Sequence, residues 1–393
     1  MKKTKTKSSL RVGLVVPHIF MHREILPHVI FAPAKLALDL AEGLQDLDST
    51  EVTLFTPGPV DTSVRTITAD LSYFETELQG RSDTYLDLLK KHPFTFVTLA
   101  RQVQGELLAK AFAMANRDEL DIVHIYTNEE DLALPFAQLC TKPVVFTHHD
   151  PFNFLIKYKN VFPKYASHNW ISMSLAQQAT MPAGTNWVGT IYHGLPDGLY
   201  TPNYAPQGTY VAYLGRIIQP KGVHLAIAAV KAYNAAHDDK LTLKIAGKHY
   251  AGHKKDTYWQ EHVLPELNDP AIEYVGFIDS VEGKQEFLGN ARVLLTPSLF
   301  EEPFGMVLIE SLACGTPVIG LASGAIPEIV QHGKTGIIVP KQQDEQALAK
   351  DLASAIPEAL QLDRHACRSD FEARFTAARM CREHLAVYRK LTE

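Results

Sequence analysis

Two glutamates eight positions apart, set around a proline–phenylalanine–glycine turn, give the clearest chemical signal. Residues 297–320 read PSLFEEPFGMVLIESLACGTPVIG, with the acids at Glu302 and Glu310. Pro303 fixes φ and suits the first turn of a helix. The free N–H groups of such a helix start and its dipole make an anion site. The residues expected to open the helix are Phe304, Gly305, Met306 and Val307.

The spacing of the acids indicates the size of the ligand. If the segment is helical throughout, Glu302 and Glu310 lie about 12 Å apart, whereas a hydrolytic carboxyl pair lies roughly 5–10 Å apart. The longer distance matches a nucleotide-sugar. One acid can bind sugar hydroxyls and the other ribose hydroxyls, with a diphosphate at the helix start. The competing interpretation is a pair of solvated acids on a helix surface.

A basic pair lies in LGRIIQPKG, residues 214–222. Arg216 follows an expected strand and the residue Gly215, and Lys221 lies at the next expected helix start. The planar guanidinium and the compact ammonium both suit a diphosphate. Without the acidic motif the two would be equally well explained as surface cations, and with it they predict a phosphate subsite.

Two adjacent histidines end another expected strand, VVFTHHDP at residues 144–151. Neighbouring strand residues point to opposite faces, so only one of His148 and His149 can face a ligand. An imidazole there can hydrogen-bond a hydroxyl or stabilise developing charge. A zinc site from these two and His124 is not expected, since no cysteine or spaced carboxylate completes it. We expect no obligatory metal or other cofactor.

Two strand-end turns are weaker candidates. Gly247 follows LTLKIA, and Phe277 follows IEYVG. Either turn can frame a nucleobase, with the main chain near Phe277 bonding to it, and either can be purely structural.

These residues need a scaffold of strands and helices, and the sequence supplies it twice. The first series of continuous apolar runs predicts buried parallel strands; the runs are 10–16, 51–56, 121–126, 142–148, 169–174 and 186–194. Between them lie amphipathic stretches such as residues 34–47, where leucines 36, 40, 44 and 47 share a helical face. This alternation of strand and helix predicts an open α/β domain.

A Pro- and Gly-rich stretch, residues 194–209, is expected to connect two domains. The alternation then restarts, with strands expected at 210–215, 241–247, 272–276, 292–297, 317–321 and 335–340, and with helices expected at 221–236 and 305–314. In the last segment Phe371, Phe375, Ala378, Cys381, Leu385 and Tyr388 are expected on one helical face.

The domain prediction follows from this order. Residues 1–195 form an N-terminal Rossmann-like domain, and residues 196–370 form a C-terminal Rossmann-like domain. Residues 371–393 form a helix that packs back on the first domain. Each parallel sheet binds ligands at the carboxyl ends of its strands, and two such edges facing each other make an interdomain cleft.

Composition excludes several classes of protein. The 393 residues are 46% hydrophobic and 21% charged, as in folded globular domains. The net charge of −6 gives no footprint for nucleic acid. Four dispersed cysteines fit reduced thiols, and neither a signal peptide nor an apolar run long enough for a membrane span is present. We expect a cytoplasmic protein. A lipid acceptor would bring it to a membrane surface, although its charge gives this little support.

The acidic segment resembles the signature of family 4 of the retaining glycosyltransferases, also described as glycosyl transferases group 1. The similarity continues through ACGTPVIG (313–320) and SGAIPEIVQHGKTGIIVP (323–340). The resemblance implies the GT-B fold, in which two Rossmann-like domains face each other, with residues 1–195 as the acceptor-side domain and residues 196–370 as the nucleotide-sugar donor domain. It implies that Glu302 lies at the donor sugar, that Glu310 holds ribose, and that Arg216 and Lys221 neutralise the leaving diphosphate. It also selects His149, which directly precedes Asp150 as in the family pattern.

One region departs from that family. Ala32 and Pro33 stand where members have a Gly-Gly turn after the first strand. Ala tolerates positive φ poorly and Pro lacks an N–H donor, so acceptor-side geometry is less secure than donor binding. The same loop carries His18, His22, Arg23 and His28, and we expect it to be polar and cationic.

The prediction is a retaining, metal-independent hexosyltransferase that uses a nucleotide-sugar donor and an acceptor that is a sugar, a lipid-linked group or a small molecule. Two alternatives stay open. One is a nucleotide-sugar epimerase or a phosphorylase on the same scaffold, and the other is a non-catalytic nucleotide-sugar binder. The base, the sugar, the acceptor and the oligomeric state do not follow from the sequence.

Overall fold

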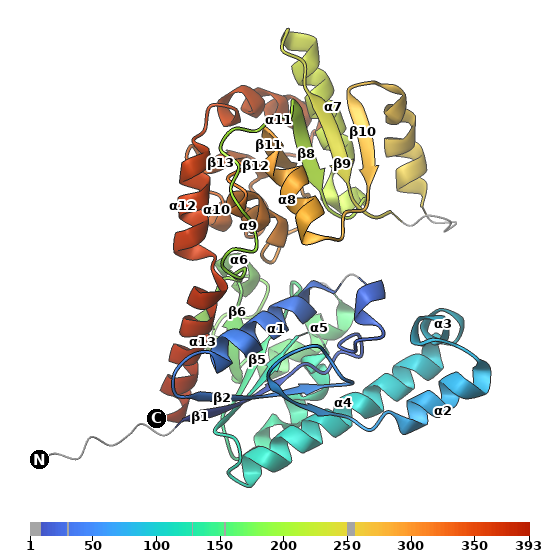
Figure 1. Ribbon diagram of the computed structural model, residues 1–393, viewed down its shortest axis with the longest axis vertical. Coiled ribbons are helices and arrows are strands. Elements are labelled where there is room, and N and C mark those ends of the chain that lie inside the picture. Colours follow the sequence, from blue (N-terminus) through green and yellow to red (C-terminus); the bar gives the residue numbers. More distant parts are fainter. Residues whose placement is uncertain (1–8, 30, 128, 153–154, 250–255) are drawn as a thin grey trace, which may run out of the picture. The chain divides into compact units, whose positions relative to one another are not determined.

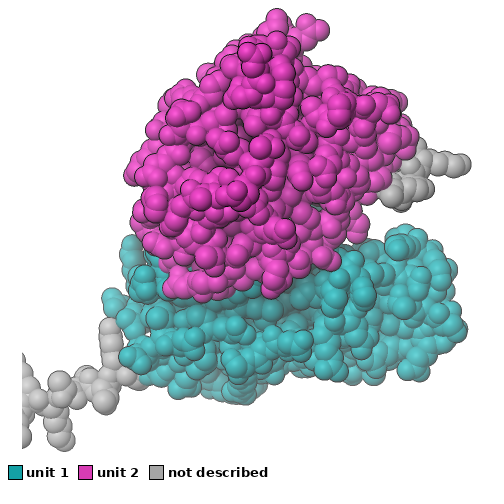
Figure 2. Space-filling view, turned by 45° about the horizontal axis from the view of Figure 1, so that its top comes forward, with its two compact units in different colours: residues 1–173, 177–192, 377–393 teal, residues 174–176, 193–376 magenta. Residues whose placement is uncertain are grey.

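The computed structural model describes residues 9–29, 31–127, 129–152, 155–249 and 256–393. The chain divides into two compact units (Figure 2). Unit 1 contains residues 1–173, 177–192 and 377–393, and unit 2 contains residues 174–176 and 193–376.

Unit 1 is built on a sheet of seven parallel strands in the order β3-β2-β1-β4-β5-β6-β7. Figure 1 labels β1, β2, β5 and β6 of this sheet. Its strands are β1 (Leu10–Val15), β2 (Thr50–Thr56), β3 (Arg65–Thr68), β4 (Ile122–Tyr126), β5 (Val144–Thr147), β6 (Asn169–Ser172) and β7 (Trp187–Thr190). Its helices are α1 (Ala32–Gln45), α2 (Ser72–Arg81), α3 (Tyr85–Lys91), α4 (Pro93–Asn116), α5 (Ile156–Val161) and α13 (Ala377–Thr392), and α6 (Leu175–Gln178) is divided between the units.

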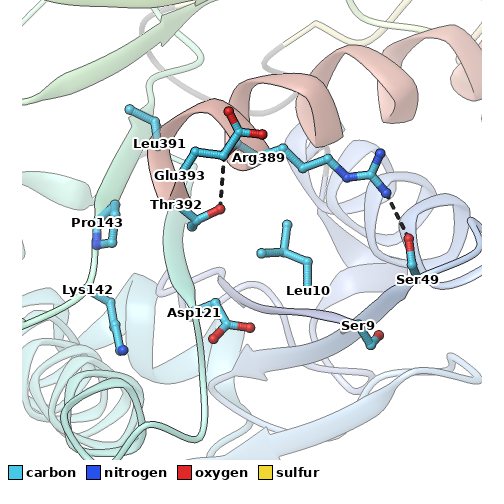
Figure 3. Close-up of a pocket in the computed structure, with 10 residues that line it drawn as sticks. All are labelled: Ser9, Leu10, Ser49, Asp121, Lys142, Pro143, Arg389, Leu391, Thr392 and Glu393. Carbon is cyan, nitrogen blue, oxygen red and sulfur yellow. Dashed lines mark hydrogen bonds between the residues drawn. The ribbon is translucent and has the colours of Figure 1, made fainter. Parts of the chain in front are cut away.

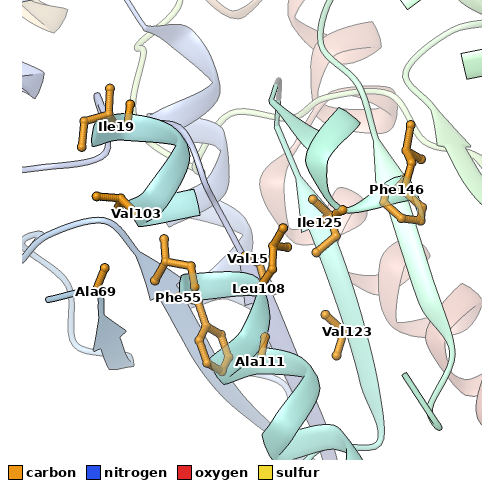
Figure 4. Packing of buried hydrophobic residues seen from close by; sticks show 14 of the residues in the cluster. Val15, Ile19, Phe55, Ala69, Val103, Leu108, Ala111, Val123, Ile125 and Phe146 are labelled. Carbon is orange, nitrogen blue, oxygen red and sulfur yellow. The ribbon is translucent and has the colours of Figure 1, made fainter. Parts of the chain in front are cut away.

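The core of unit 1 lies between the central strands and α4. Apolar side chains of β1, β2, β4 and β5 meet Val103, Leu108 and Ala111 of α4 (Figure 4). Helices α1 and α13 pack against each other, and Cys381 of α13 reaches the backbone of α1, where its Sγ lies 2.6 Å from the position a Cβ on Gly43 would take. The strands of this sheet are parallel, as their continuous apolar runs predicted.

Unit 2 has a second parallel sheet, in the order β10-β9-β8-β11-β12-β13. Its strands are β8 (Tyr210–Leu214), β9 (Thr242–Ala246), β10 (Ile272–Gly276), β11 (Val293–Thr296), β12 (Val318–Leu321) and β13 (Gly336–Val339). Its helices are α7 (Val223–Ala236), α8 (Val281–Gly289), α9 (Met306–Ala313), α10 (Ile326–Ile329), α11 (Glu345–Ala359) and α12 (Arg364–Arg374). The predicted fold class, two Rossmann-like parallel-sheet domains, is confirmed.

Every expected strand is present, and one strand escaped prediction. β3 (Arg65–Thr68) is a four-residue edge strand with no fully buried side chain, so it lacks the apolar run that marks the others. The first helix ends at Gln45, so Leu47 lies beyond it.

The last segment is two helices rather than one. α12 ends at Arg374, and Thr376 forms a bridge with Leu195 before α13 begins. This break changes the helical phase, so Ala377 is buried and Ala378 is exposed, contrary to the expected face. Residues 371–376 belong to unit 2 and residues 377–393 to unit 1, so the unit boundary falls six residues later than the expected one at 370.

The expected interdomain connection, residues 194–209, lies entirely in unit 2. Asn203 donates its N–H to the carbonyl of Cys314 at 3.0 Å, and its own carbonyl accepts from the guanidinium of Arg364 at 2.5 Å. Because these contacts bind the segment to helices of the same unit, it is a packed part of that unit rather than a free linker.

A cavity of about 460 Å³ opens in unit 1 at the amino ends of β1 and β4, beside the last turn of α13 (Figure 3). Arg389 crosses it to donate to the hydroxyl of Ser49 at 2.8 Å. The residues with predicted chemistry follow the carboxyl ends of their strands, so this cavity lies at the opposite edge of the sheet and is not the predicted site.

Candidate functional site

In unit 2 the predicted donor residues gather on the loops after the carboxyl ends of the strands. Gly215 follows β8, Gly247 follows β9, Phe277 follows β10, and Glu302 lies on the loop after β11. Backbone hydrogen bonds join these loops. The N–H groups of residues 299 and 300 donate to the carbonyl of Pro220, and the N–H of residue 325 donates to the carbonyl of Glu302 at 2.8 Å.

The helix that carries the acidic motif starts later than expected. α9 begins at Met306, with Gly305 as its N-cap, so residues 302–305 form a turn and the helical spacing of Glu302 and Glu310 does not apply. Gly305 has φ of +102°, a conformation that a side chain disfavours. The N–H groups of Met306 and Val307 remain at the helix start, as predicted for an anion site.

Phe304 contributes differently from its neighbours. Its ring is 2% exposed and packs edge-on against His193 with ring centroids 4.9 Å apart. The side chain therefore anchors the turn inside unit 2, and only the backbone of Phe304 is left for a ligand.

Glu302 is buried and held through one oxygen. Lys221 donates its ammonium to Oε1, and Ser298 donates its hydroxyl to the same atom at 2.9 Å. Only 12% of the Glu302 side chain and 18% of the Lys221 side chain is exposed. The structure therefore brings the predicted acid and one predicted cation into direct contact.

Glu310 repeats this arrangement one turn into α9. Its Oε1 accepts from the ammonium of Lys284 at 2.8 Å and from the hydroxyl of Tyr200 at 3.4 Å. Burial, reinforced by the nearby carboxylate, raises the pKa of Tyr200 well above its usual value, so this hydroxyl stays a donor. Each motif glutamate thus has one lysine and one hydroxyl on a single oxygen.

Arg216 and Lys221 lie on one turn, and Tyr213 at the end of β8 holds this turn through hydrogen bonds. The buried hydroxyl of Tyr213 donates to the carbonyl of Arg216 at 3.1 Å and to that of Lys221 at 3.4 Å. Arg216 is exposed, and its guanidinium pairs with no acid among the described residues. It is therefore available to an anionic ligand, whereas Lys221 is shared with Glu302.

The turn at Gly247 lies against Gly215, next to the basic turn, and the turn at Phe277 lies beside the turn at Gly247. A Cβ on Gly247 would lie 1.8 Å from the carbonyl oxygen of Gly215, so only glycine allows these strand ends to approach. Phe277 is 48% exposed, and the ammonium of Lys248 lies 5.9 Å from its ring centroid. The prediction that these turns frame a base stays a prediction.

In unit 1, His149 follows β5 and is 9% exposed, with its ring edge-on to Tyr126 at a centroid distance of 4.8 Å. Its neighbour His148 is fully buried and pairs with Glu130. The side chain of Gln177 fixes the backbone on both sides of His149, because it donates to the carbonyls of His148 at 2.8 Å and Asp150 at 3.0 Å. The two rings therefore have different surroundings, and His149 is the more accessible.

His124 has a structural role. His124 bonds to the hydroxyl of Tyr388 at 2.6 Å and to that of Thr147 at 2.8 Å, and burial lowers its pKa well below the usual value. Among the described residues no group of three or more His, Cys, Asp or Glu side chains is arranged to hold a metal ion.

The loop after β1 is less cationic than expected. The Nδ1 atoms of His18 and His22 each accept a backbone N–H, and burial lowers the pKa of His22. The departure at Ala32 and Pro33 is accommodated without strain. α1 begins there with Pro in its first turn, and neither residue has positive φ.

Three residues that contact Glu302 or Glu310 were not predicted as part of the site: Ser298, Tyr200 and Lys284. Ser298 lies within the acidic segment, four residues before Glu302, and its position could have suggested a contact. Tyr200 and Lys284 lie 110 and 26 positions from Glu310, and no sequence pattern links them to it.

Residues 203–369 match the family described as glycosyl transferases group 1. Spore coat protein SA of Bacillus subtilis is 24% identical over 231 residues, which cover 53% of this chain and 60% of that protein. The chain therefore spans three fifths of the length of this relative.

Solved structures share the fold along nearly the whole chain. Sucrose-phosphate synthase of Thermosynechococcus elongatus has a TM-score of 0.69 at 20% identity, covering 97% of this chain and 99% of that one. HepE of Anabaena, in complex with UDP-glucose, has a TM-score of 0.65 at 18% identity, covering 97% and 100%. No helix among the described residues is both long and apolar enough to cross a membrane. The chain has the GT-B fold of these structures, and its residues 203–369 match the glycosyl transferases group 1 family.

Proposed function

We propose that this protein is a retaining glycosyltransferase that moves a hexose-type sugar from a nucleotide-sugar to an acceptor. The observation that carries the proposal is the pair of buried glutamates, each held through Oε1 by a lysine and a hydroxyl. This arrangement leaves Oε2 of each acid to accept a ligand hydroxyl. A solvent-exposed acid on a helix surface would not need a lysine and a hydroxyl group to hold it in place.

Each donor residue then has a role. Glu302 positions the sugar, and Glu310 binds ribose. Arg216, Lys221 and the N–H groups of Gly305, Met306 and Val307 stabilise the departing diphosphate, because paired cations and a helix start both favour phosphate. These groups already supply positive charge, so we propose that the reaction needs no divalent metal.

We place the acceptor on unit 1, with His149 near the reacting sugar. No carboxylate is assigned as a nucleophile, so the acceptor hydroxyl attacks the anomeric carbon on the face the diphosphate leaves. The departing phosphate oxygen takes the hydroxyl proton. The C–O bond to the acceptor forms as the C–O bond to phosphate breaks, and the configuration is retained. A covalent glycosyl-enzyme adduct detected by mass spectrometry would exclude this mechanism.

The first experiment is thermal unfolding with UDP, GDP, ADP and their hexose conjugates, with and without EDTA. A ligand at about 100 times its dissociation constant stabilises the folded state by roughly 2.7 kcal/mol. We expect a shift with one base, unchanged by EDTA and lost in Arg216→Ala. A shift that EDTA abolishes would contradict metal independence, and no shift with any ligand would favour a function other than nucleotide-sugar transfer.

A bound donor then identifies the reaction. Incubation with the conjugate and candidate sugar, lipid-linked and small-molecule acceptors should yield a glycoside whose anomeric proton coupling shows retention. Conversion of the donor without an acceptor would instead indicate an epimerase, and a requirement for inorganic phosphate would indicate a phosphorylase.

A further inference from the structure

Lys284 holds Glu310 in place, and the proposed function gives it no contact with the nucleotide. We propose that Lys284 is a specificity residue for the nucleotide: it fixes Glu310 through one oxygen and donates its remaining protons to the ribose diol. This inference rests on the proposed function, because it requires a nucleotide on the donor edge of unit 2.

The two oxygens of the Glu310 carboxylate have different surroundings. Both contacts that the structure gives this carboxylate, from Lys284 at 2.8 Å and from Tyr200 at 3.4 Å, fall on Oε1. Among the described residues no donor contacts Oε2. A hydroxyl of a ligand can therefore donate to Oε2 without displacing a protein contact.

Lys284 lies on a capped helix. Ser280 is the N-cap of α8, and its hydroxyl accepts the N–H of Gly283 at 3.0 Å. The N–H of Lys284 bonds to the carbonyl of Ser280 at 3.1 Å. The backbone that carries Lys284 is therefore fixed in the first turn of a helix, and from there its ammonium reaches Glu310.

The ion pair between Lys284 and Glu310 is largely buried. Only 28% of the Lys284 side chain and 10% of the Glu310 side chain is exposed. By contrast Lys341 and Glu301, which form an ion pair of the same 2.8 Å length, are 35% and 60% exposed. A largely buried ion pair is weak evidence for stability, because desolvation offsets its attraction. Its presence at the carboxyl edge of the unit 2 sheet is better explained by the ligand that the pair can bind.

A vicinal diol can bond to both members of this pair. An ammonium has three protons, of which Lys284 uses one on Glu310. Each ribose hydroxyl is both donor and acceptor, so one can donate to Oε2 while its neighbour accepts from Nζ. A site that bonds to a hydroxyl rejects a ligand without it, because the buried polar groups then lose their partner.

The test is titration calorimetry of the full chain with UDP and 2′-deoxy-UDP, and with the matching GDP and ADP pairs if UDP does not bind. The natural protein should bind the ribonucleotide at least ~10-fold more tightly than the deoxynucleotide. In Lys284→Met this ratio should fall to about 1–3, and Lys284→Arg should restore part of it. Lys341→Met, which breaks the exposed pair, should leave the ratio unchanged.

A structural role predicts a different result. If Lys284 only neutralises Glu310, Lys284→Met should weaken both ligands equally, and an unchanged ratio would overturn the inference while leaving the proposed function intact. If that variant does not fold, Lys284→Gln, which can still donate to Oε1, should show a reduced ratio, and an unchanged one would again overturn it. Failure of the natural protein to bind any of the three nucleoside diphosphates would overturn the proposed function and this inference together.

Discussion

The carboxyl edges of the two sheets differ in their electrostatics. In unit 2 the edge carries ion pairs at Glu302 and Glu310 and an exposed Arg216. In unit 1 the corresponding edge is built around buried histidines, with His149 against Tyr126. Burial lowers the pKa of both His124 and His384 in this unit.

The difference teaches how each edge suits its proposed ligand. A diphosphate brings charge, so its site needs fixed cations, and the cations in turn allow acids to be buried beside them. An acceptor hydroxyl is neutral, and a neutral imidazole can bond to it without a counter-charge. The predictions below test this contrast, in order of decreasing expected effect.

The largest effect should follow Glu302→Gln. The substitution leaves Lys221 without its counter-charge and removes the carboxylate from the sugar site, so we expect the rate of transfer to fall by about 10²–10³-fold. Steady-state kinetics measures this. Glu301→Gln is the matched control, since its side chain is 60% exposed and pairs with Lys341 instead. Equal losses in the two variants would contradict the assigned role.

Arg216→Ala should weaken binding of the nucleoside diphosphate by about 10–100-fold, in line with roughly 1.5–3 kcal/mol for a hydrogen bond to a charged group. Calorimetric titration at two salt concentrations should show a smaller loss at high salt, because ions screen exposed charges. Arg81→Ala, at an exposed helix pair with Glu77, serves as control. A loss independent of salt would indicate a structural rather than an electrostatic role.

Unit 1 should lose stability in acid. Burial lowers the pKa of His384 to about 4, so between pH 6.5 and 4 the unfolded chain binds a proton that the folded chain excludes. The free energy of unfolding therefore falls as pH falls through this window, by roughly 2 kcal/mol at pH 5 for this residue.

Chemical denaturation at pH 8 and pH 5 measures the effect. His384→Leu should reduce the difference between the two pH values, even if it lowers stability at both. His92→Leu, at an exposed position, should leave the difference unchanged. A pH dependence that survives His384→Leu in full would show that other groups are responsible.

The smallest effect concerns the departure at Ala32 and Pro33. Because α1 begins there without positive φ, Ala32→Gly with Pro33→Gly should only increase the flexibility of the helix start, and we expect a loss of about 1 kcal/mol. The transfer rate should stay within twofold. A marked gain in rate would mean that the missing Gly-Gly turn limits the acceptor side after all.

Much of the fold was predictable because its information is local. Continuous apolar runs such as those of β4 and β5 marked buried parallel strands. The acidic segment and the basic pair each follow an expected strand, which predicted that Glu302, Arg216 and Lys221 lie on one edge of one sheet. The errors arose where local patterns compete. Pro303 suggested a helix start, but the chain turns until Gly305, and the bridge at Thr376 divided a helix that periodicity alone would continue.

The sequence by itself determined most of the strands and helices and the parallel sheets, and it pointed to most of the residues that we propose bind a nucleotide-sugar. Periodicity and turn chemistry act over a few residues, so they are legible in the chain. Only the tertiary structure decided which lysine and which hydroxyl group bind the same carboxylate oxygen of Glu302 and of Glu310. Tyr200 and Lys284 reach Glu310 from distant positions because folding brings α8, α9 and the segment before β8 together. Such contacts depend on packing in three dimensions, and no spacing along the chain encodes them.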